Sequence, residues 1–365
     1  MIITKTPYRI SFFGGGTDYP SWYSGHGGAV LSTTIDKYCY VSCRYLPPFF
    51  NIKHRIVWSH IETVSTLAEI LHPAVRESLK WMDFDDTVGL EIHHQGDLPA
   101  RSGMGSSSSF AVGLIKCLSA LKGQMITKHD LALGAIELEQ RILAEPVGSQ
   151  DQMAAAYGGF NVIQFSPNGD IRVQPLTVAP ERIRELESNL MLFYTGTSRL
   201  AAQIGADVIG HMAERHTVLQ RMRGMVDEAI EMLNGKGAMS DFGFLLDESW
   251  SLKRQLSALI SNSNIDNIYQ RALAAGALGG KLLGAGASGF MLFFVPPFRQ
   301  EAVKTALSEF LYVPVQFEKD GCSVIHYDVD FPNMRCLERE LPTPILATSR
   351  TRNSRSDFSV RKVSV

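Results

Sequence analysis

A glycine- and serine-rich segment, LPARSGMGSSSS at residues 98–109, constrains this chain more than any other stretch, and it runs directly into an apolar helical segment at 110–121. Glycines allow positive φ angles, so successive backbone N–H groups can converge on one anion. The helix that follows adds unpaired amides and the positive end of its dipole. The segment is therefore either a phosphate-binding loop or a flexible turn with serine caps. It lacks the lysine of the P-loop pattern G-x-x-x-x-G-K-[ST].

The composition is that of an ordinary globular protein, with 365 residues, 45% apolar and 20% charged. Its length allows two domains. The formal net charge of −2 shows no excess of basic residues that would attract nucleic acid or an anionic membrane. The five cysteines form no C-x-x-C pair, and the N-terminus has no long apolar segment of a signal peptide. We therefore expect a cytoplasmic protein without nucleic-acid or membrane partners, and a homodimer is compatible with this.

Alternating and β-branched segments predict strands, and helical periodicity predicts helices. The expected strands are residues 8–13, 28–45, 87–94, 160–176 (a hairpin turning at 167–170), 189–194, 281–295 (strand–turn–strand) and 313–327. The expected helices are residues 106–122, 128–144 (opened by Thr127 with Asp130 in its first turn), 148–157, 200–233, 241–262, 265–277 and 298–311. This order indicates an α+β fold rather than a doubly wound sheet.

Three further clusters contain candidate catalytic or ligand-binding residues. Residues 6–19, TPYRISFFGGGTDY, place Arg9 on a strand that ends in three glycines and a Thr-Asp pair, where Asp18 either binds sugar hydroxyls or caps a turn. Glu139 and Asp151 lie on successive predicted helices, where carboxylates either hold Mg²⁺ and orient a hydroxyl or form a solvated face. Residues 281–290, KLLGAGASGF, contain G-x-G-x-x-G but lead into a strand, so we expect a hairpin loop packed under another glycine loop, not a dinucleotide site.

Together and in this order, the four clusters resemble those of the GHMP kinases, the family of galactokinase, homoserine kinase, mevalonate kinase and phosphomevalonate kinase. Residues 99–108 resemble the motif P-x-x-x-G-L-G-S-S-[SA], with Met104 in place of leucine. Residues 9–19 resemble the galactokinase motif R-x-N-L-I-G-E-H-T-D-Y, with Gly15 and Gly16 in place of Glu-His. Residues 146–152 resemble the P-C-G-x-x-D-Q segment, and residues 281–289 resemble the C-terminal glycine motif.

The resemblance implies a two-domain α+β fold, with an N-terminal ribosomal-protein-S5-domain-2-like domain and a C-terminal ferredoxin-like α/β sandwich. We expect domains at residues 1–187 and 188–341, with a boundary near 180–190. Residues 342–365 form a basic tail, which we expect to lie outside the core, either solvated or docked on a partner. The tail carries five basic residues against Asp357: Arg350, Arg352, Arg355, Arg361 and Lys362.

The resemblance also assigns roles, with ATP and Mg²⁺ as the cofactors. Asp151 matches the catalytic aspartate, and Arg9 matches the arginine that keeps it ionised. Ser107 and Glu139 match the Mg²⁺ ligands. The residues expected to bind the ATP phosphates are Arg101, Ser102, Gly103, Met104, Gly105, Ser106, Ser107 and Ser108. The residues expected to bind the acceptor are Gly15, Gly16, Thr17, Asp18, Gly148, Thr195, Gly196, Thr197, Arg199 and Gly286, with Thr195–Arg199 as the leading hypothesis for an acceptor phosphate.

Within the family, residues 9–18, 33–38 and 148–152 look most like the branch that holds D-glycero-D-manno-heptose 7-phosphate kinases and the kinase domain of fucokinases. This implies phosphorylation of the anomeric C1 hydroxyl of the heptose 7-phosphate to the 1,7-bisphosphate, in the formation of nucleotide-activated heptose for bacterial surface polysaccharide. Gly15 and Gly16 leave room for a sugar larger than galactose. The alternatives are a fucokinase-like or other free-sugar 1-kinase and, from a different class, a catalytically inactive sugar-binding regulator.

Overall fold

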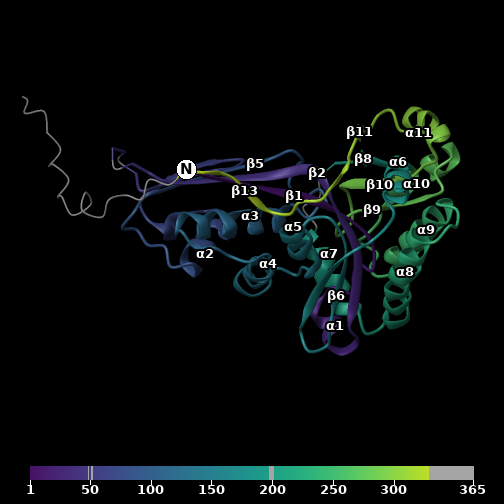
Figure 1. The fold of residues 1–365 in the computed structure, drawn as a ribbon, viewed down its shortest axis with the longest axis horizontal. Helices are drawn as coiled ribbons and strands as arrows, with labels where there is room; N and C mark the ends of the chain where they lie inside the picture. Colours follow the sequence, from purple (N-terminus) through teal and green to yellow (C-terminus); the bar gives the residue numbers. More distant parts are fainter. Residues whose placement is uncertain (48, 51, 197–200, 329–365) are drawn as a thin grey trace, which may run out of the picture. The chain divides into compact units, whose positions relative to one another are not determined.

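The strands of this computed structural model, which describes residues 1–328 except 48, 51 and 197–200, form two sheets (Figure 1). Among the described residues, nine strands form a large sheet with the central order β13-β1-β2-β5-β3-β4. Its strands are β1 (Ile2–Phe13), β2 (Gly28–Tyr45), β3 (His54–Val57), β4 (Ile61–Val64), β5 (Leu90–Gly96), β6 (Phe160–Phe165), β7 (Ile171–Pro175), β12 (Phe317–Glu318) and β13 (Ser323–Tyr327). The second sheet has the order β11 (Leu311–Val313), β8 (Leu190–Tyr194), β10 (Phe290–Phe294) and β9 (Gly279–Leu282).

Helices cover these sheets, and Figure 1 shows α3, α4 and α5 along one face of the large sheet. The helices near the large sheet are α1 (Pro20–His26), α2 (Pro73–Trp81), α3 (Ser106–Leu121), α4 (Lys128–Ile136) and α5 (Gln150–Tyr157). The others are α6 (Pro180–Ser188), α7 (Ala201–His211), α8 (His216–Asn234), α9 (Ser240–Arg254), α10 (Ser263–Ala275) and α11 (Gln300–Ala306). Short 3₁₀ turns occupy Leu67–Glu69 and Pro297–Arg299. The expected α+β class is confirmed.

The first strand, β1, lies at the centre of the molecule. Every residue from 6 to 13 is buried, because β2 pairs along this stretch and helices α3, α5, α8 and α9 all contact β1, whereas β13 pairs only with residues 2–5. A strand covered in this way loses the polar–apolar alternation of a half-exposed strand. At its end, Phe12 and Phe13 pack edge-on against Phe242 of α9, with ring centroids 5.5 and 5.1 Å apart. Phe242 also packs against Phe294 of β10, with ring centroids 6.4 Å apart, so an aromatic cluster links β1 to the second sheet.

Helix α3 is buried on nearly all sides, as expected of a helix that is apolar all round. It packs across β1 and β2, with α4 and α5 against it. The predicted range 106–122 agrees with the observed Ser106–Leu121. Its N-cap is Gly105, with a φ of 73°, so the helix begins directly after the left-handed turn of the serine-rich segment.

Several local predictions agree with the structure. Residues 160–176 form the β6–β7 hairpin, and Gly169 has the positive φ of 92° that its turn requires. The Thr127 hydroxyl caps α4 by accepting a hydrogen bond from the Asp130 amide. Helices α1, α2 and α6 and the β3–β4 hairpin lie outside the predicted elements, although each of these helices begins at a proline, which is a usable start signal.

Other predictions need correction. The single helix expected at 200–233 is two helices, α7 and α8. The single strand expected at 313–327 is three short strands, because Pro314, which has no N–H for a ladder, follows β11. Of these, β12 and β13 pair with β2 and β1, so the chain returns to the large sheet from the range expected for the second domain. The expected basic tail at 342–365 lies outside the described residues.

Candidate active site

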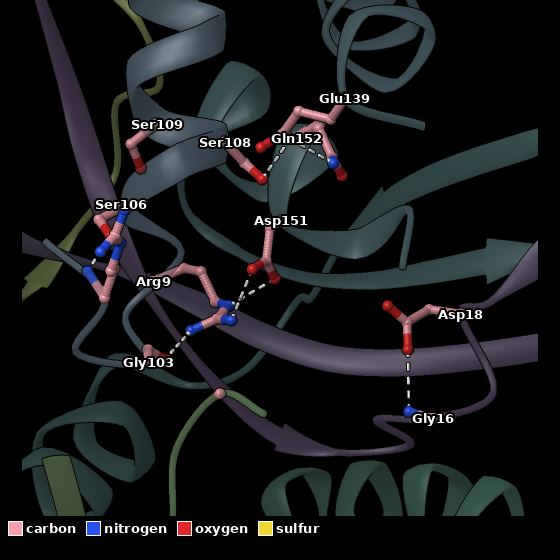
Figure 2. Close-up of polar contacts among 12 residues, drawn as sticks. Arg9, Gly16, Asp18, Gly103, Ser106, Ser108, Ser109, Glu139, Asp151 and Gln152 are labelled. Atoms are coloured by element: carbon pink, nitrogen blue, oxygen red, sulfur yellow. Dashed lines mark hydrogen bonds and ion pairs between the residues drawn. The ribbon is translucent and has the colours of Figure 1, made fainter. Parts of the chain in front are cut away.

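The predicted catalytic residues meet where β1, the loop before α3 and the start of α5 come together (Figure 2). Arg9 donates from Nε and Nη2 to the two carboxylate oxygens of Asp151, at 2.7 Å each. Its Nη1 donates to the Gly103 carbonyl at 2.7 Å. A planar guanidinium that forms such a parallel pair fixes the orientation of the carboxylate. The Arg9 side chain is only 5% exposed, whereas that of Asp151 is 22% exposed, so the carboxylate is the part of the pair that solvent reaches.

The serine-rich segment passes directly over this pair. Left-handed backbone at Arg101, Gly103 and Gly105, with φ angles of 60°, 83° and 73°, folds it into a tight loop. A Cβ on Gly105 would lie 3.3 Å from both Arg9 Cγ and Asp151 Oδ2, so the loop backbone touches the ion pair. Met104 is fully buried, and its carbonyl accepts a hydrogen bond from the Arg9 amide. Only backbone groups of Met104 can therefore face a phosphate.

The serine hydroxyls of this loop have different partners. Ser102 is buried and donates to the Pro99 carbonyl at 2.6 Å, so it holds the turn closed. The Ser106 hydroxyl accepts from the Arg101 amide at 3.2 Å. Ser108 donates to Glu139 at 2.6 Å, while Ser107 is exposed at the helix start. The loop thus holds its backbone amides on a turn that its own hydrogen bonds close, which suits it to bind an anion.

The second glycine loop packs under the first, as its sequence context predicts. A Cβ on Gly284 would lie 2.3 Å from Gly103 Cα, and one on Gly289 would lie 2.4 Å from the Ser102 carbonyl oxygen. The Phe290 amide donates to the same carbonyl at 3.1 Å. Gly286, expected to contact the acceptor, packs instead against the backbone of Ile260, where a Cβ on the glycine would lie 2.7 Å from Ile260 Cα. The second glycine loop therefore supports the serine-rich loop.

Glu139 lies in a buried polar cluster beside the start of α3. The regular helix expected at 128–144 becomes a π-helix at Glu137–Ile142, and this wider turn carries Glu139. Its Oε2 accepts from Ser108 Oγ and from Gln152 Nε2, both at 2.6 Å (Figure 2). Burial raises the pKa of Glu139 to about 7, against the opposing effect of hydrogen bonds from Ser108, Ser107 and Gln152.

The other Glu139 oxygen, Oε1, is buried and has no hydrogen-bond partner among the described residues. A buried carboxylate oxygen without a partner is costly unless something else satisfies it. Hydroxyl and carboxylate oxygens are the ligands that Mg²⁺ prefers, and it uses few of them beside phosphate. Glu139, with Ser107 and Ser108 beside it, therefore fits a magnesium site. No group of three or more His, Cys, Asp or Glu side chains that could hold a metal by themselves occurs in the described part of the chain.

The turn after β1 holds a buried carboxylate. Asp18 is 2% exposed, and its Oδ1 accepts from the Gly16 amide at 2.9 Å. Burial, and then the charge of Asp151, raise the pKa of Asp18. Gly148 is required here because a Cβ would lie 1.9 Å from Asp18 Oδ2. Thr17, expected to bind the acceptor, is fully buried, and its hydroxyl donates to the carbonyls of Gly14 and Ala29, so it shapes the turn instead.

The segment expected to bind an acceptor phosphate is only partly described. The Thr195 hydroxyl donates to the Gly289 carbonyl at 2.9 Å, which ties this segment to the second glycine loop. Gly196 follows with a φ of 117° and open space around it. Thr197 and Arg199 lie outside the described residues.

Two lysines near the ion pair, the buried Lys281 and the half-buried Lys253, are absent from the predicted site residues. Lys281 is 3% exposed and donates to the Phe12 carbonyl at 2.6 Å; burial, and then Arg9, lower its pKa to about 7. Lys253 donates to the carbonyls of Leu282 and Gly284, and burial lowers its pKa well below the usual value. Lys281 could have been identified from the sequence, because it begins the second glycine cluster. Lys253 could not, because it lies on an ordinary amphipathic helix.

Two family descriptions match this chain: "GHMP kinases N terminal domain" over residues 64–159 and "GHMP kinases C terminal" over residues 223–313. The D-glycero-alpha-D-manno-heptose 7-phosphate kinase of Campylobacter jejuni is 32% identical over 338 residues, which cover 88% of this chain and 97% of that protein. The chain belongs to the GHMP kinase family. Members of this family are ATP-dependent kinases, and the Arg9–Asp151 pair under the glycine-rich loop agrees with that activity.

Two other comparisons extend the likeness. The bifunctional fucokinase/GDP-fucose pyrophosphorylase of Arabidopsis thaliana is 28% identical over 310 residues, covering 79% of this GHMP kinase but only 29% of the plant protein. The crystal structure of a D-glycero-D-manno-heptose 1-phosphate kinase from Bacteroides thetaiotaomicron superposes with a TM-score of 0.72 at 24% identity, covering 89% of this chain and 99% of that one, which supports the fold. No helix in the part of the chain described by the structure combines the length and apolarity needed to cross a membrane.

Proposed function

We propose that this GHMP kinase transfers the γ-phosphoryl group of ATP to the anomeric hydroxyl of D-glycero-D-manno-heptose 7-phosphate and yields the 1,7-bisphosphate. The observation that carries the proposal is the bidentate Arg9–Asp151 pair directly beneath the Gly105 backbone. The heptose 7-phosphate kinase of Campylobacter jejuni, which aligns over nearly its whole length, supports the choice of acceptor.

In this proposal Asp151 receives the proton of the acceptor hydroxyl. Both carboxylate oxygens accept from Arg9, yet each keeps a further lone pair for a substrate proton. Because an anomeric hydroxyl is more acidic than other sugar hydroxyls, modest assistance by a carboxylate suffices. Arg9 prevents the carboxylate from rotating away, so its contribution is orientation and charge, the main sources of catalysis in phosphoryl transfer.

The phosphates of ATP would lie against the amides of residues 102–108 and the N-terminus of α3. Glu139, Ser107 and Ser108 would hold Mg²⁺ at the same end of the helix, and its charge would offset that of the β- and γ-phosphate oxygens. Gly15, Gly16, Asp18 and Gly148 would line the sugar, and residues 195–199 would take its 7-phosphate.

The test is a coupled assay of ADP release by the full-length protein with Mg-ATP and, in turn, heptose 7-phosphate, mannose, fucose and galactose. NMR of the product identifies the phosphorylated carbon. We expect the highest kcat/KM with heptose 7-phosphate and phosphate on the anomeric carbon. Phosphate on any other carbon would overturn the proposal.

The assay also separates the alternatives. A preference for fucose would favour the fucokinase-like activity, which the similarity to the Arabidopsis thaliana protein also allows. Sugar binding without turnover would favour an inactive regulator. Wherever turnover is observed, Asp151→Asn serves as the control, because it should abolish turnover while the affinity for ATP stays unchanged.

A further inference from the structure

Gly15 is the one glycine of the run Gly14–Gly16 whose backbone conformation does not require a glycine. Gly14 and Gly16 have φ angles of 83° and 99°, which side chains rarely adopt, and a Cβ on Gly14 would also lie 1.9 Å from the Ala29 carbonyl oxygen. Gly15 has no such φ, and a Cβ there would meet nothing closer than 3.7 Å. A Cβ there would make only ordinary van der Waals contacts, so neither strain nor a clash explains the glycine.

Two polar side chains border the space that a Gly15 side chain would occupy. The position of the absent Gly15 Cβ lies 3.7 Å from Gln150 Nε2 and 3.9 Å from Ser11 Oγ, and no other atom outside residues 14–16 lies within 4 Å of it. A ligand oxygen in van der Waals contact with Gly15 Cα on this side could approach either group to hydrogen-bond distance.

Ser11 reaches this space from β1. Arg9 and Ser11 pair with Thr34 and Ser32 of β2 with no register shift between them, so both point to the same face of the strand. Ser11 is only 8% exposed, and its hydroxyl has no hydrogen-bond partner among the described residues. Nearly all buried polar side-chain atoms have a partner, so an unpartnered buried hydroxyl on the strand face that carries Arg9 points to a ligand.

Gln150 reaches the same space from the first residue of α5, next to Asp151. A hydrogen bond from Gln150 lowers the pKa of Asp18, although burial dominates and raises it. The Gln150 carbonyl oxygen, Oε1, is buried and has no partner among the residues described. The amide is thus held by Asp18 on one side and offers an unused acceptor on the other.

We propose that Ser11 and Gln150 form a subsite over Gly15 that binds one non-reacting hydroxyl of the acceptor sugar. The groups are neutral and include both a donor and an acceptor, which suits a hydroxyl that itself donates and accepts. An anionic group there would face the unpartnered Gln150 oxygen, which disfavours phosphate relative to a hydroxyl. This inference rests on the proposed sugar kinase activity and identifies residues that select the acceptor and position it beside Asp151.

Three variants of the full-length enzyme test the subsite: Ser11→Ala, Gln150→Met and Gly15→Ala. The probe is whichever sugar of the panel above the wild type phosphorylates best. Each variant should raise the acceptor KM by roughly three- to tenfold, the usual worth of one hydrogen bond, while the KM for ATP stays unchanged. The double variant S11A/Q150M should lose less than the product of the single losses, because both side chains contact one hydroxyl.

Stability separates a binding role from a structural one. Because the Ser11 hydroxyl has no partner among the described residues, S11A should leave the Tm unchanged or raise it. Ser78→Ala is the matched control: Ser78, on α2, is fully buried and its hydroxyl likewise has no partner in the described part of the chain, so its loss should change neither KM nor Tm.

If S11A and Q150M leave the acceptor KM of an active enzyme unchanged, the subsite is wrong and the kinase activity stands. A lowered Tm for S11A with an unchanged acceptor KM would likewise overturn the subsite, in favour of a structural role. If the wild type phosphorylates none of the sugars, the proposed function fails, and the subsite fails with it.

Discussion

Replacing Asp151 by Asn removes the negative charge that faces the buried guanidinium of Arg9. The Arg9 side chain is 5% exposed and makes two hydrogen bonds of 2.7 Å to Asp151 and one of 2.7 Å to Gly103. Two unit charges about 4 Å apart attract by about 4 kcal/mol at an effective dielectric constant of about 20. Removal of one partner from a buried pair costs roughly 3–5 kcal/mol. Because Asp151 is 22% exposed, we expect a loss near the lower end, about 3 kcal/mol in the free energy of unfolding.

A double-mutant cycle isolates the interaction itself. Arg9→Met leaves Asp151 with access to water, so it should cost less than D151N, about 2 kcal/mol. The double variant R9M/D151N should be more stable than the sum of the single losses predicts, by about 2 to 3 kcal/mol.

Urea unfolding of the full-length protein without ligands, followed by tryptophan fluorescence at pH 7.5, gives these free energies. The matched control is the exposed Arg223–Asp227 pair on α8, where the same residue types should couple by less than about 0.5 kcal/mol. Additivity of R9M and D151N within about 0.5 kcal/mol would refute the reasoning, because it would mean that the buried pair contributes no more than a surface pair.

Three further predictions concern the surrounding residues. Gly148→Ala places a Cβ 1.9 Å from Asp18 Oδ2, so it should displace that carboxylate. We expect the acceptor KM to rise by roughly tenfold or more, while the KM for ATP serves as the internal control. An unchanged acceptor KM would contradict this. Burial raises the pKa of Glu139 from its usual 4.5 to about 7, so the native chain binds more protons than the unfolded chain between these values. Its metal-free stability should therefore fall as pH rises from 4.5 to 7; Glu139→Gln should make that slope shallower in urea titrations, and an unaltered slope would count against this role of Glu139. Burial and Arg9 lower the pKa of Lys281 from 10.5 to about 7, so the unfolded chain binds more protons in that range and stability should rise from pH 7 to 10.5; the rise should be smaller in Lys281→Met, with Lys253 contributing the remainder, and an unchanged rise would contradict this.

The polar cluster around Glu139 is predicted only in part by the sequence. The family resemblance predicts Glu139 as a metal ligand, and the structure brings it to the serine-rich loop. The hydroxyl that donates to it at 2.6 Å is that of Ser108, whereas the resemblance assigns Ser107 to the metal. Adjacent serines at a helix start point in different directions, and the π-helical turn under Glu139 has no recognisable pattern along the chain.

Thr17 and Lys253 show the two ways in which the sequence misleads about the site: one residue is expected there and serves the turn, and the other lies near the site without being expected. Thr17 resembles a sugar ligand because it adjoins Asp18, but its hydroxyl satisfies carbonyls across the turn. Lys253 resembles any solvated lysine on a helix, but its ammonium group donates to carbonyls of the second glycine loop. In both cases the hydrogen-bond partners come from segments that local pattern does not reveal.

The sequence alone predicts the elements that depend on glycine, proline and hydrophobic periodicity. These are the tight loop at 101–105, helix α3 behind it and the β6–β7 hairpin. These depend on φ angles and on side-chain spacing within a few residues, so they can be derived from the chain alone. The meeting of Arg9 with Asp151, 142 residues later, could be inferred only through a family resemblance. The return of β13 to β1 and the approach of Ser11 and Gln150 to Gly15 could not be inferred at all. Such contacts join residues far apart in sequence, and long-range packing decides which distant groups share a site.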